Sequence, residues 1–262
     1  MKPYYDEGGI TIYHGDAVCV LALIDTLSID AVIADPPYAE TNLQWDRWPD
    51  SWPQAVAQQV PRSAPLWCFG SLRMFLDRSD EFAQWSIAQE VVWEKHNGSN
   101  FHADRFRRVH ELAVQWYRGE WANIYRAVVT TPDATARTVR KKARPPQWHG
   151  ATGDNVYRSE DGGPRLQRSV IYCRSEHGRA LHPTQKPLGI LEPLVRYSCP
   201  PGGTVLDLFA GAGSASLAAK QHGCRSIAVE ADERYCEIAA KRLAQGVLDF
   251  GVGDRYDTEE EQ

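Results

Sequence analysis

The sequence predicts an α/β fold: a doubly wound, mostly parallel sheet with an inserted segment. Short apolar runs alternate with amphipathic stretches in both halves of the chain, which is typical of strand-helix-strand units. Between the two halves, residues 138–169 are basic, rich in proline and glycine, and without a clear period, which predicts a loop-rich insertion. A chain of 262 residues can hold one large domain of this kind around a sizeable core.

Each regular element follows from its local pattern. Apolar runs predict strands over 10–13, 31–34, 64–70, 86–95 and 111–119, and amphipathic stretches predict helices over 17–25 and 71–85. Residues 202–245 have the pattern strand, glycine turn, helix, strand and helix, with the second strand ending at Glu230.

Charge divides the chain into two regions. Residues 102–179 hold 15 Lys and Arg against 8 Asp and Glu, a net charge of +7. Because the whole chain has a net charge of −5, the remaining residues together carry −12. An acidic body with a basic middle favours a segment that faces a polyanion. The six cysteines stand singly, without a CxxC pair, and are expected as free thiols in a cytoplasmic protein. Because no apolar stretch approaches 18 residues, no membrane partner is expected.

The strand predicted at 31–34 runs directly into Asp35-Pro36-Pro37-Tyr38. Two prolines are an ordinary way to end a strand, and on that interpretation Asp35 only accepts hydrogen bonds from turn amides. The alternative is a ligand site, because open α/β sheets bind ligands beyond the carboxyl ends of their strands.

A second candidate site lies in the glycine turn "DLFAGAGS" (207–214). Gly211 and Gly213 would let the backbone approach a nucleotide, and Glu230, 17 residues after Gly213, could accept hydrogen bonds from a ribose diol. Because Ser216 stands where a dinucleotide fingerprint has Gly or Ala, pyrophosphate binding is disfavoured.

Three motifs occur in one order: "DPPY" (35–38), "HPTQKP" (182–187) and "DLFAGAG" (207–213). Together they resemble the S-adenosylmethionine-dependent DNA amino-methyltransferases of the beta arrangement, in which the catalytic motif precedes the cofactor motif. Here 172 residues separate Asp35 from Asp207, and the basic insertion lies between them, where that family has its target-recognition segment. The resemblance covers most of residues 9–245.

The resemblance implies a Rossmann-like methyltransferase fold with permuted motif order that methylates adenine N6 at specific sites in double-stranded DNA. S-adenosylmethionine is the implied cofactor, and no metal is needed. The implied catalytic residues are Asp35, Pro36, Pro37 and Tyr38. The Asp35 carboxylate and the Pro36 carbonyl would accept the two amino N–H donors, and Tyr38 would stack on a base extruded from the duplex.

On the cofactor side, the resemblance places Asp16 near the adenine and Glu230 on the ribose. The position of Asp16 suits a helix N-cap equally well. The methionine end would meet polar groups of the HPTQKP motif and of the glycine turn. The full predicted cofactor set is Asp16, Asp35, Thr184, Gln185, Lys186, Asp207, Phe209, Gly211, Gly213 and Glu230.

Two basic clusters are predicted to bind DNA. Arg105, Arg107 and Arg108 precede a stretch that resembles the family's hairpin near the active site, and the second cluster lies in the insertion. It comprises Arg140, Lys141, Lys142 and Arg144. The tryptophans at 45, 48 and 52 are expected mainly to pack in the core and anchor loops.

The predicted segments are a catalytic segment (residues 1–101), a hairpin and target-recognition insertion (102–179), a cofactor-binding segment (180–248) and an acidic tail (249–262). Beyond DNA, a second copy of the chain and a cognate restriction enzyme are the partners considered. Methylation of cytosine N4 is the nearest alternative function, since the same acceptor pair serves both amino groups. A dinucleotide-binding oxidoreductase would use the glycine turn and Glu230 but leaves the DPPY motif unexplained, and a DNA-binding regulator without activity is the third alternative.

Overall fold

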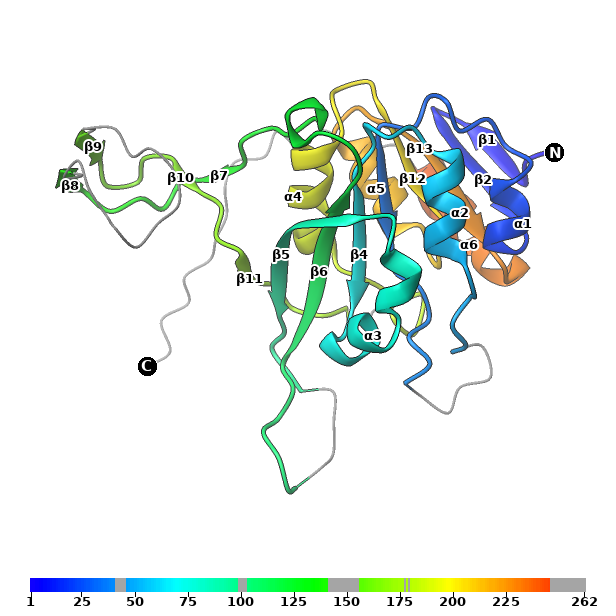
Figure 1. Cartoon of the computed structure of the whole chain (residues 1–262), viewed down its shortest axis with the longest axis horizontal. Helices are drawn as coiled ribbons and strands as arrows, with labels where there is room; N and C mark the ends of the chain where they lie inside the picture. Colours follow the sequence, from blue (N-terminus) through cyan, green and yellow to red (C-terminus); the bar gives the residue numbers. More distant parts are fainter. Residues whose placement is uncertain (41–45, 99–102, 141–155, 177, 179, 246–262) are drawn as a thin grey trace.

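The structure is a computed structural model that describes residues 1–40, 46–98, 103–140, 156–176, 178 and 180–245. Within these residues the largest sheet has nine strands in the order β1-β2-β13-β12-β3-β4-β6-β5-β11 (Figure 1). In chain order its strands are β1 (Tyr5–Glu7), β2 (Ile10–His14), β3 (Ala31–Ala34), β4 (Leu66–Gly70), β5 (Ser86–Glu94), β6 (His110–Tyr117), β11 (Val170–Tyr172), β12 (Thr204–Asp207) and β13 (Arg225–Glu230).

Most of this sheet is parallel, as the sequence predicts. The neighbours from β2 through β13, β12 and β3 to β4 all run parallel. β6 is antiparallel to both β4 and β5, because β5 and β6 are joined by a loop and not by a crossover helix. The strands from the two ends of the chain interleave, with β12 and β13 inserted between β2 and β3.

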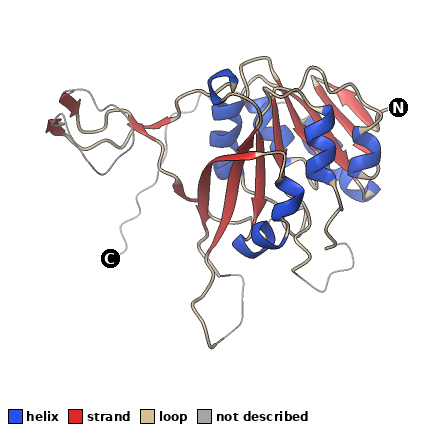
Figure 2. Cartoon of the chain, in the orientation of Figure 1, coloured by secondary structure: helices blue, strands red, loops and turns tan. Residues whose placement is uncertain are grey.

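Helices cover both faces of the sheet (Figure 2). Alternate residues of β3 and β4 enter different cores: Val32 and Leu66 pack with the helices of the first half, whereas Ile33 and Trp67 pack with those of the second. Both faces of these strands are apolar, because helices cover the sheet on either side and bury the side chains of both faces. The described α-helices are α1 (Ala17–Leu21), α2 (Trp52–Gln59), α3 (Leu72–Asp77), α4 (Leu188–Ser198), α5 (Ser214–Gln221) and α6 (Glu233–Ala244).

Two predicted helices are shorter than expected. The helix predicted over 17–25 ends at Leu21, and Thr26, just beyond the predicted end, donates a hydrogen bond to the carbonyl of Gln59 at 2.6 Å. The helix predicted over 71–85 divides into α3 and a 3-10 helix, Ser79–Phe82. The division follows a tertiary contact, since Glu81 accepts a hydrogen bond from Trp48 Nε1 at 2.7 Å. Helix α2 was not predicted.

The described part of the insertion forms an arm, residues 130–140 and 156–166, that projects from the body (Figure 1). Strand β7 (Thr130–Thr131) pairs with β10 (Arg165–Leu166), and β8 (Arg137–Arg140) pairs with β9 (Val156–Ser159), both antiparallel. Strands of two to four residues are too short to show a period in the sequence, which is why the sequence predicts a loop-rich segment here but not these strands. No helix among the described residues is long and apolar enough to cross a membrane.

Candidate active site

A cleft opens where the strand order reverses. The chain continues from β3 to β4 on one side, and β12 lies on the other, so the carboxyl ends of β3 and β12 meet at a topological switch point. The cleft at this edge has a volume of about 2870 Å³. Ordinary small-molecule pockets hold roughly 300–1,000 Å³, so there is room for a cofactor and a second large group.

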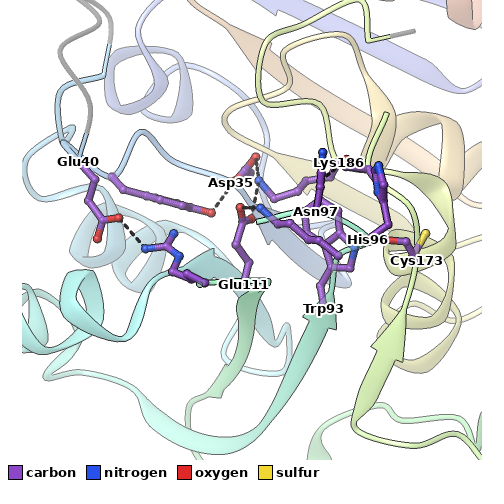
Figure 3. A network of polar contacts seen from close by, with 12 residues as sticks. Asp35, Glu40, Trp93, His96, Asn97, Glu111, Cys173 and Lys186 are labelled. Carbon is purple, nitrogen blue, oxygen red and sulfur yellow. Dashed lines mark hydrogen bonds and ion pairs between the residues drawn. The ribbon is translucent and has the colours of Figure 1, made fainter. Parts of the chain in front are cut away.

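Asp35 follows β3 directly and is held on both oxygens. The Tyr38 hydroxyl donates to Asp35 Oδ1 at 2.8 Å, and Lys186 Nζ donates to Oδ2 at 2.5 Å (Figure 3). The Asp35 side chain is 21% exposed, so it still reaches the cleft. Because a carboxylate has about four lone-pair positions, it can accept a further donor from a ligand.

Lys186 links Asp35 to a second carboxylate, Glu111 of β6. Its Nζ lies 3.4 Å from Glu111 Oε2, and Lys95 donates to the other Glu111 oxygen (Figure 3). The Lys95 ammonium also lies 4.6 Å from the centre of the Trp93 ring. The four charged side chains form an alternating chain from the base of the β5–β6 hairpin to Asp35.

Burial and pairing act in opposite directions in this chain of charges. Burial alone would raise the pKa of Glu111, but Lys186 and Lys95 outweigh it and lower that pKa to about 2. Burial would lower the pKa of Lys186, yet Asp35 and Glu111 raise it overall, so the ammonium stays charged. Burial and the neighbouring Asp35 charge raise the pKa of Tyr38 well above its ordinary value, which keeps its hydroxyl a donor.

The backbone after Tyr38 is constrained. Ala39 has φ of 57°, a left-handed conformation that a residue with a Cβ rarely adopts. Its N–H donates to Oδ1 of the buried Asp46 at 2.8 Å. Glu40 accepts hydrogen bonds from Ser71 and from Arg108 Nη1, the latter at 3.1 Å. Such strain persists where surrounding contacts over-determine a functional loop.

The glycine turn lies against Glu230. Gly211 N donates to Glu230 Oε2 at 2.7 Å, and Asp232 N donates to Oε1 at 2.8 Å. Gly211 has φ of 50°, and a Cβ there would lie 3.2 Å from the His182 ring. Burial raises the pKa of Glu230, and these amide donors oppose the rise.

Gly213 does not line the cleft, although Gly211 does. A Cβ on Gly213 would lie 3.0 Å from Leu243 Cδ1 and 3.2 Å from Ala239 Cβ, both on α6. Its small size therefore serves the packing of α6 on the turn. The prediction that Gly213 lets the backbone approach the cofactor gains no support from this position.

Asp207 is buried at the end of β12, beside the turn. Burial raises its pKa to about 7, with the Asp35 and Glu230 charges adding to the rise and a hydrogen bond from Phe209 N opposing it. Phe209 also lines the cleft.

The other predicted cofactor residues also line the cleft. Asp16 caps α1, accepting from Val18 N and Cys19 N at 3.0 and 2.9 Å, so the capping role is present together with the position near the cleft. Thr184 Oγ1 lies 3.2 Å from His182 Nδ1, and Gln185 accepts from Leu181 N at 2.9 Å. Lys186 is turned to the carboxylates of Asp35 and Glu111.

The predicted DNA-binding residues divide into two groups. Arg105, Arg107 and Arg108 line the cleft, where Arg105 pairs with Asp104 at 2.7 Å and Arg108 pairs with Glu40 at 3.1 Å. Both pairs are partly exposed, and such pairs are weak enough to be exchanged for phosphates. Arg140 ends β8, but its side chain lies outside the described residues, as do Lys141, Lys142 and Arg144.

Sequence reasoning missed four residues of the site: Lys95, Glu111, Asp46 and His182. Lys95 and Glu111 stand at the ends of apolar strands, so a buried ion pair could not be distinguished from ordinary strand ends. The signal for His182 was present, since it opens the HPTQKP motif. Its ring packs on Tyr235 with centroids 4.3 Å apart, and burial lowers its pKa. As expected, Trp48 and Trp52 are buried in the core, whereas Trp45 lies outside the described residues.

Comparisons with known proteins agree with this geometry. Type II methyltransferase M2.DpnII of Streptococcus pneumoniae is 25% identical over 92% of each chain. Type II methyltransferase M2.LlaDCHI of Lactococcus lactis subsp. cremoris is 24% identical over 94% of this chain and 93% of its own. These matches span the insertion as well as both motif-bearing ends.

Solved structures show the same fold. M1.HpyAVI, solved as a complex with S-adenosylmethionine, has a TM-score of 0.61 at 24% identity and covers 90% of this chain and all of its own. The cytosine-N4-specific PvuII DNA methyltransferase has a TM-score of 0.62 at 15% identity, covering 94% of this chain and 90% of its own. A family model of N6/N4 DNA methylases matches residues 29–241, from β3 to α6, and so includes all three motifs. The chain belongs to the N6/N4 family of DNA methylases.

Proposed function

We propose that the protein transfers the methyl group of S-adenosylmethionine to adenine N6 at specific sites in duplex DNA. The observation that carries the proposal is the Asp35 carboxylate, held by Tyr38 and Lys186 at the carboxyl end of β3 and facing the cleft. In the amino-methyltransferases that this chain resembles, Asp at the first position of the DPPY motif favours adenine. The dinucleotide-binding oxidoreductase is excluded by membership of the family.

The described residues fit S-adenosylmethionine. The cleft joins Gly211, where a Cβ would lie 3.2 Å from the His182 ring, to the carboxylates of Glu230 and Asp207. Glu230 is suited to the ribose hydroxyls, and the buried Asp207 to the positive methionine end. When bound, the cofactor supplies an electrophilic methyl group on a sulfonium.

The protein residues position the amino group and take its proton. The Asp35 carboxylate and the Pro36 carbonyl accept the two N–H donors, which turns the nitrogen lone pair towards the methyl carbon. The cofactor would supply the methyl group from its sulfonium to this nitrogen, and the surplus amino proton would pass to Asp35. Tyr38 supplies an aromatic ring for the extruded base, while its hydroxyl fixes the carboxylate.

Residues 102–179 are the proposed hairpin and target-recognition segment, between the catalytic segment (residues 1–101) and the cofactor-binding segment (residues 180–248). The arm is basic and projects from the body, so it can reach a duplex next to the cleft (Figure 1). A cognate restriction enzyme is proposed because both curated relatives are Type II methyltransferases. The free cysteines suit a cytoplasmic location.

Methylation of cytosine N4 is the second candidate. The PvuII methyltransferase, which shares the fold, is specific for that amino group, and an acceptor pair at Asp35 would suit both bases. Sequencing DNA from cells that express the protein, with detection of modified bases, decides between them. N6-methyladenine is the expected product, and N4-methylcytosine would replace the first proposal by the second.

The role of Asp35 is tested with Asp35→Ala and the isosteric Asp35→Asn. Both should lose transfer of labelled methyl groups to DNA while calorimetry shows cofactor affinity within a few-fold of the parent. Asp25→Ala, which changes an exposed carboxylate that does not line the cleft, is the control and should transfer normally. Substantial turnover by a folded Asp35→Ala variant would contradict the assigned role.

A further inference from the structure

The turn of the β5–β6 hairpin lies at the end of the sheet where the parallel strands have their carboxyl termini, which is also the end that carries Asp35. β3 and β4 are parallel, and the last residue of β4, Gly70, pairs with Leu112 near the start of β6. The end of β5 pairs with that same start, Glu94 with His110. The described residues between β5 and β6, 95–98 and 103–109, therefore leave the sheet beside the cleft, and Figure 1 shows them extending beyond the body.

Phe106 lies in this loop and is 99% exposed. A phenylalanine so fully in water is unusual, since this residue type is usually buried. Its neighbours Arg105, Arg107 and Arg108 all line the cleft, so the ring is presented among cationic groups. A cationic surface with one projecting apolar ring has the chemistry of proteins that insert a wedge between stacked base pairs while arginines contact phosphates.

The loop is also tied to the catalytic carboxylate. Lys95, directly after β5, pairs with Glu111 of β6, and Glu111 shares Lys186 with Asp35 (Figure 3). The two ends of the connecting loop are thus held at the floor of the cleft, while the rest of the loop extends outward. An enzyme that acts on an extruded base must offset the cost of unpairing and unstacking it, and an apolar side chain inserted as a wedge into the stack can do so.

We propose that Phe106 is this wedge: its ring enters the duplex beside the target and fills the place of the extruded base. The inference rests on the proposed methylation of duplex DNA. Phe106 is a positioning residue, because it acts on the DNA stack and does not touch the reacting atoms. The arginines beside it supply affinity for the backbone, and Phe106 supplies the free energy that offsets unstacking.

The test compares Phe106→Ala with the parent on two synthetic duplexes that carry the methylated site found by sequencing. In the first duplex the target base is paired, and in the second it faces an abasic site, so little pairing opposes extrusion. On the paired duplex kcat/KM of Phe106→Ala should fall at least about tenfold, because the missing ring no longer offsets unstacking. On the second duplex the loss should be several-fold smaller, because only unstacking then opposes extrusion and less free energy has to be offset.

Two variants serve as controls. Phe106→Trp keeps an aromatic wedge and should retain most activity on the paired duplex. Leu27→Ala removes an apolar side chain that is 83% exposed, in the segment that precedes β3 at the opposite edge of the sheet, and should match the parent on both duplexes.

Equal losses by Phe106→Ala on both duplexes would overturn the inference and make Phe106 an ordinary DNA contact, as would parent-like activity on the paired duplex. Failure of the proposed function is distinguishable, because the parent itself would then transfer no methyl group to the duplex with the unpaired target.

Discussion

At the scale of single residues, the site is organised by charges that are buried in pairs. Lys186 is 6% exposed and shared between Asp35 and Glu111, so none of the three groups can lose its partner cheaply. An ammonium between two carboxylates holds Asp35 in one orientation, which suits a group whose work is to accept hydrogen bonds.

Lys186→Met should be strongly destabilising, because it leaves two partly buried carboxylates without their common cation. The free energy of unfolding should fall by about 3–5 kcal/mol, measured by urea denaturation at pH 7. Lys241→Met is the matched control: Lys241 pairs with Glu237 but is 73% exposed, and its loss should lower the free energy of unfolding far less, because solvent screens the pair. Similar costs for the two variants would show that the buried pair contributes no more than a surface pair.

Asp207 predicts a pH dependence of stability. Its folded pKa is about 7, above the value of roughly 3.9 in an unfolded chain, so the folded state binds the extra proton between these values. The contribution of Asp207 to the free energy of unfolding is therefore fully present below about pH 4. It is lost as the pH rises to about 7, by at most about 1.4 kcal/mol per pH unit. Asp207→Asn has no carboxyl group to titrate and should not show this loss. Urea denaturation at pH 5 and pH 8 should therefore find that its free energy of unfolding, relative to that of the parent, is higher at pH 8 than at pH 5. A difference that does not change with pH would contradict the raised pKa.

At the scale of elements, the glycine turn joins two functions in three residues. Gly211 brings its backbone to Glu230 and the cleft, whereas Gly213 lets α6 pack closely. The β5–β6 hairpin likewise buries Ala113 and Val114 in the core, whereas Glu111 and the arginines of its loop line the cleft. Each element thus serves the core on one side and the cleft on the other.

Gly213→Ala should destabilise the fold in two ways. A φ of 74° is unfavourable for alanine, by about 1–2 kcal/mol, and the new Cβ would press on Leu243 and Ala239. Gly223→Ala separates these effects, because Gly223 has φ of 66° with nothing within 4 Å of a Cβ. Thermal or urea unfolding should rank Gly213→Ala below Gly223→Ala. Equal losses would show that α6 adapts to the extra methyl group.

At the scale of the whole molecule, a basic middle lies on an acidic body. The 15 Lys and Arg of residues 102–179 stand against 8 Asp and Glu, and this segment comprises the arm together with the turn and second strand of the β5–β6 hairpin. Repulsion between DNA and the acidic body would direct a duplex towards this segment and the cleft mouth.

DNA affinity should therefore fall steeply with salt, by about 0.9 in the slope of log K against log salt for each phosphate contact. Replacing Arg140, Lys141, Lys142 and Arg144 by Gln should flatten that slope and weaken all duplexes alike, measured by fluorescence anisotropy at several salt concentrations. A second variant, for comparison, replaces Arg105, Arg107 and Arg108 by Gln. Two of these arginines, Arg105 and Arg108, must give up an ion pair before they can bind a phosphate. An unchanged slope in the first variant would place DNA binding at the hairpin, and a changed target preference would show that one of the four residues reads a base.

The sequence by itself determined the fold class, the three motifs and their family. Strands over 31–34 and 66–70 and the whole course from 202 to 245 were predictable, because fully apolar runs and glycine turns report local backbone preferences. The motif positions also predicted the cleft residues, since the carboxyl ends of parallel strands must meet at one edge.

Only the tertiary structure decided which charges meet across that edge. Lys186 and Asp35 are 151 residues apart in the chain. Glu111 reaches them from β6, which is antiparallel to β4, and no local sequence pattern predicts the direction of that strand. The same holds for the packing role of Gly213, which depends on α6, and for the hydrogen bond from Thr26 to Gln59. Local periodicity records how a segment buries itself, whereas an ion pair or a close packing contact depends on which segments the fold places side by side.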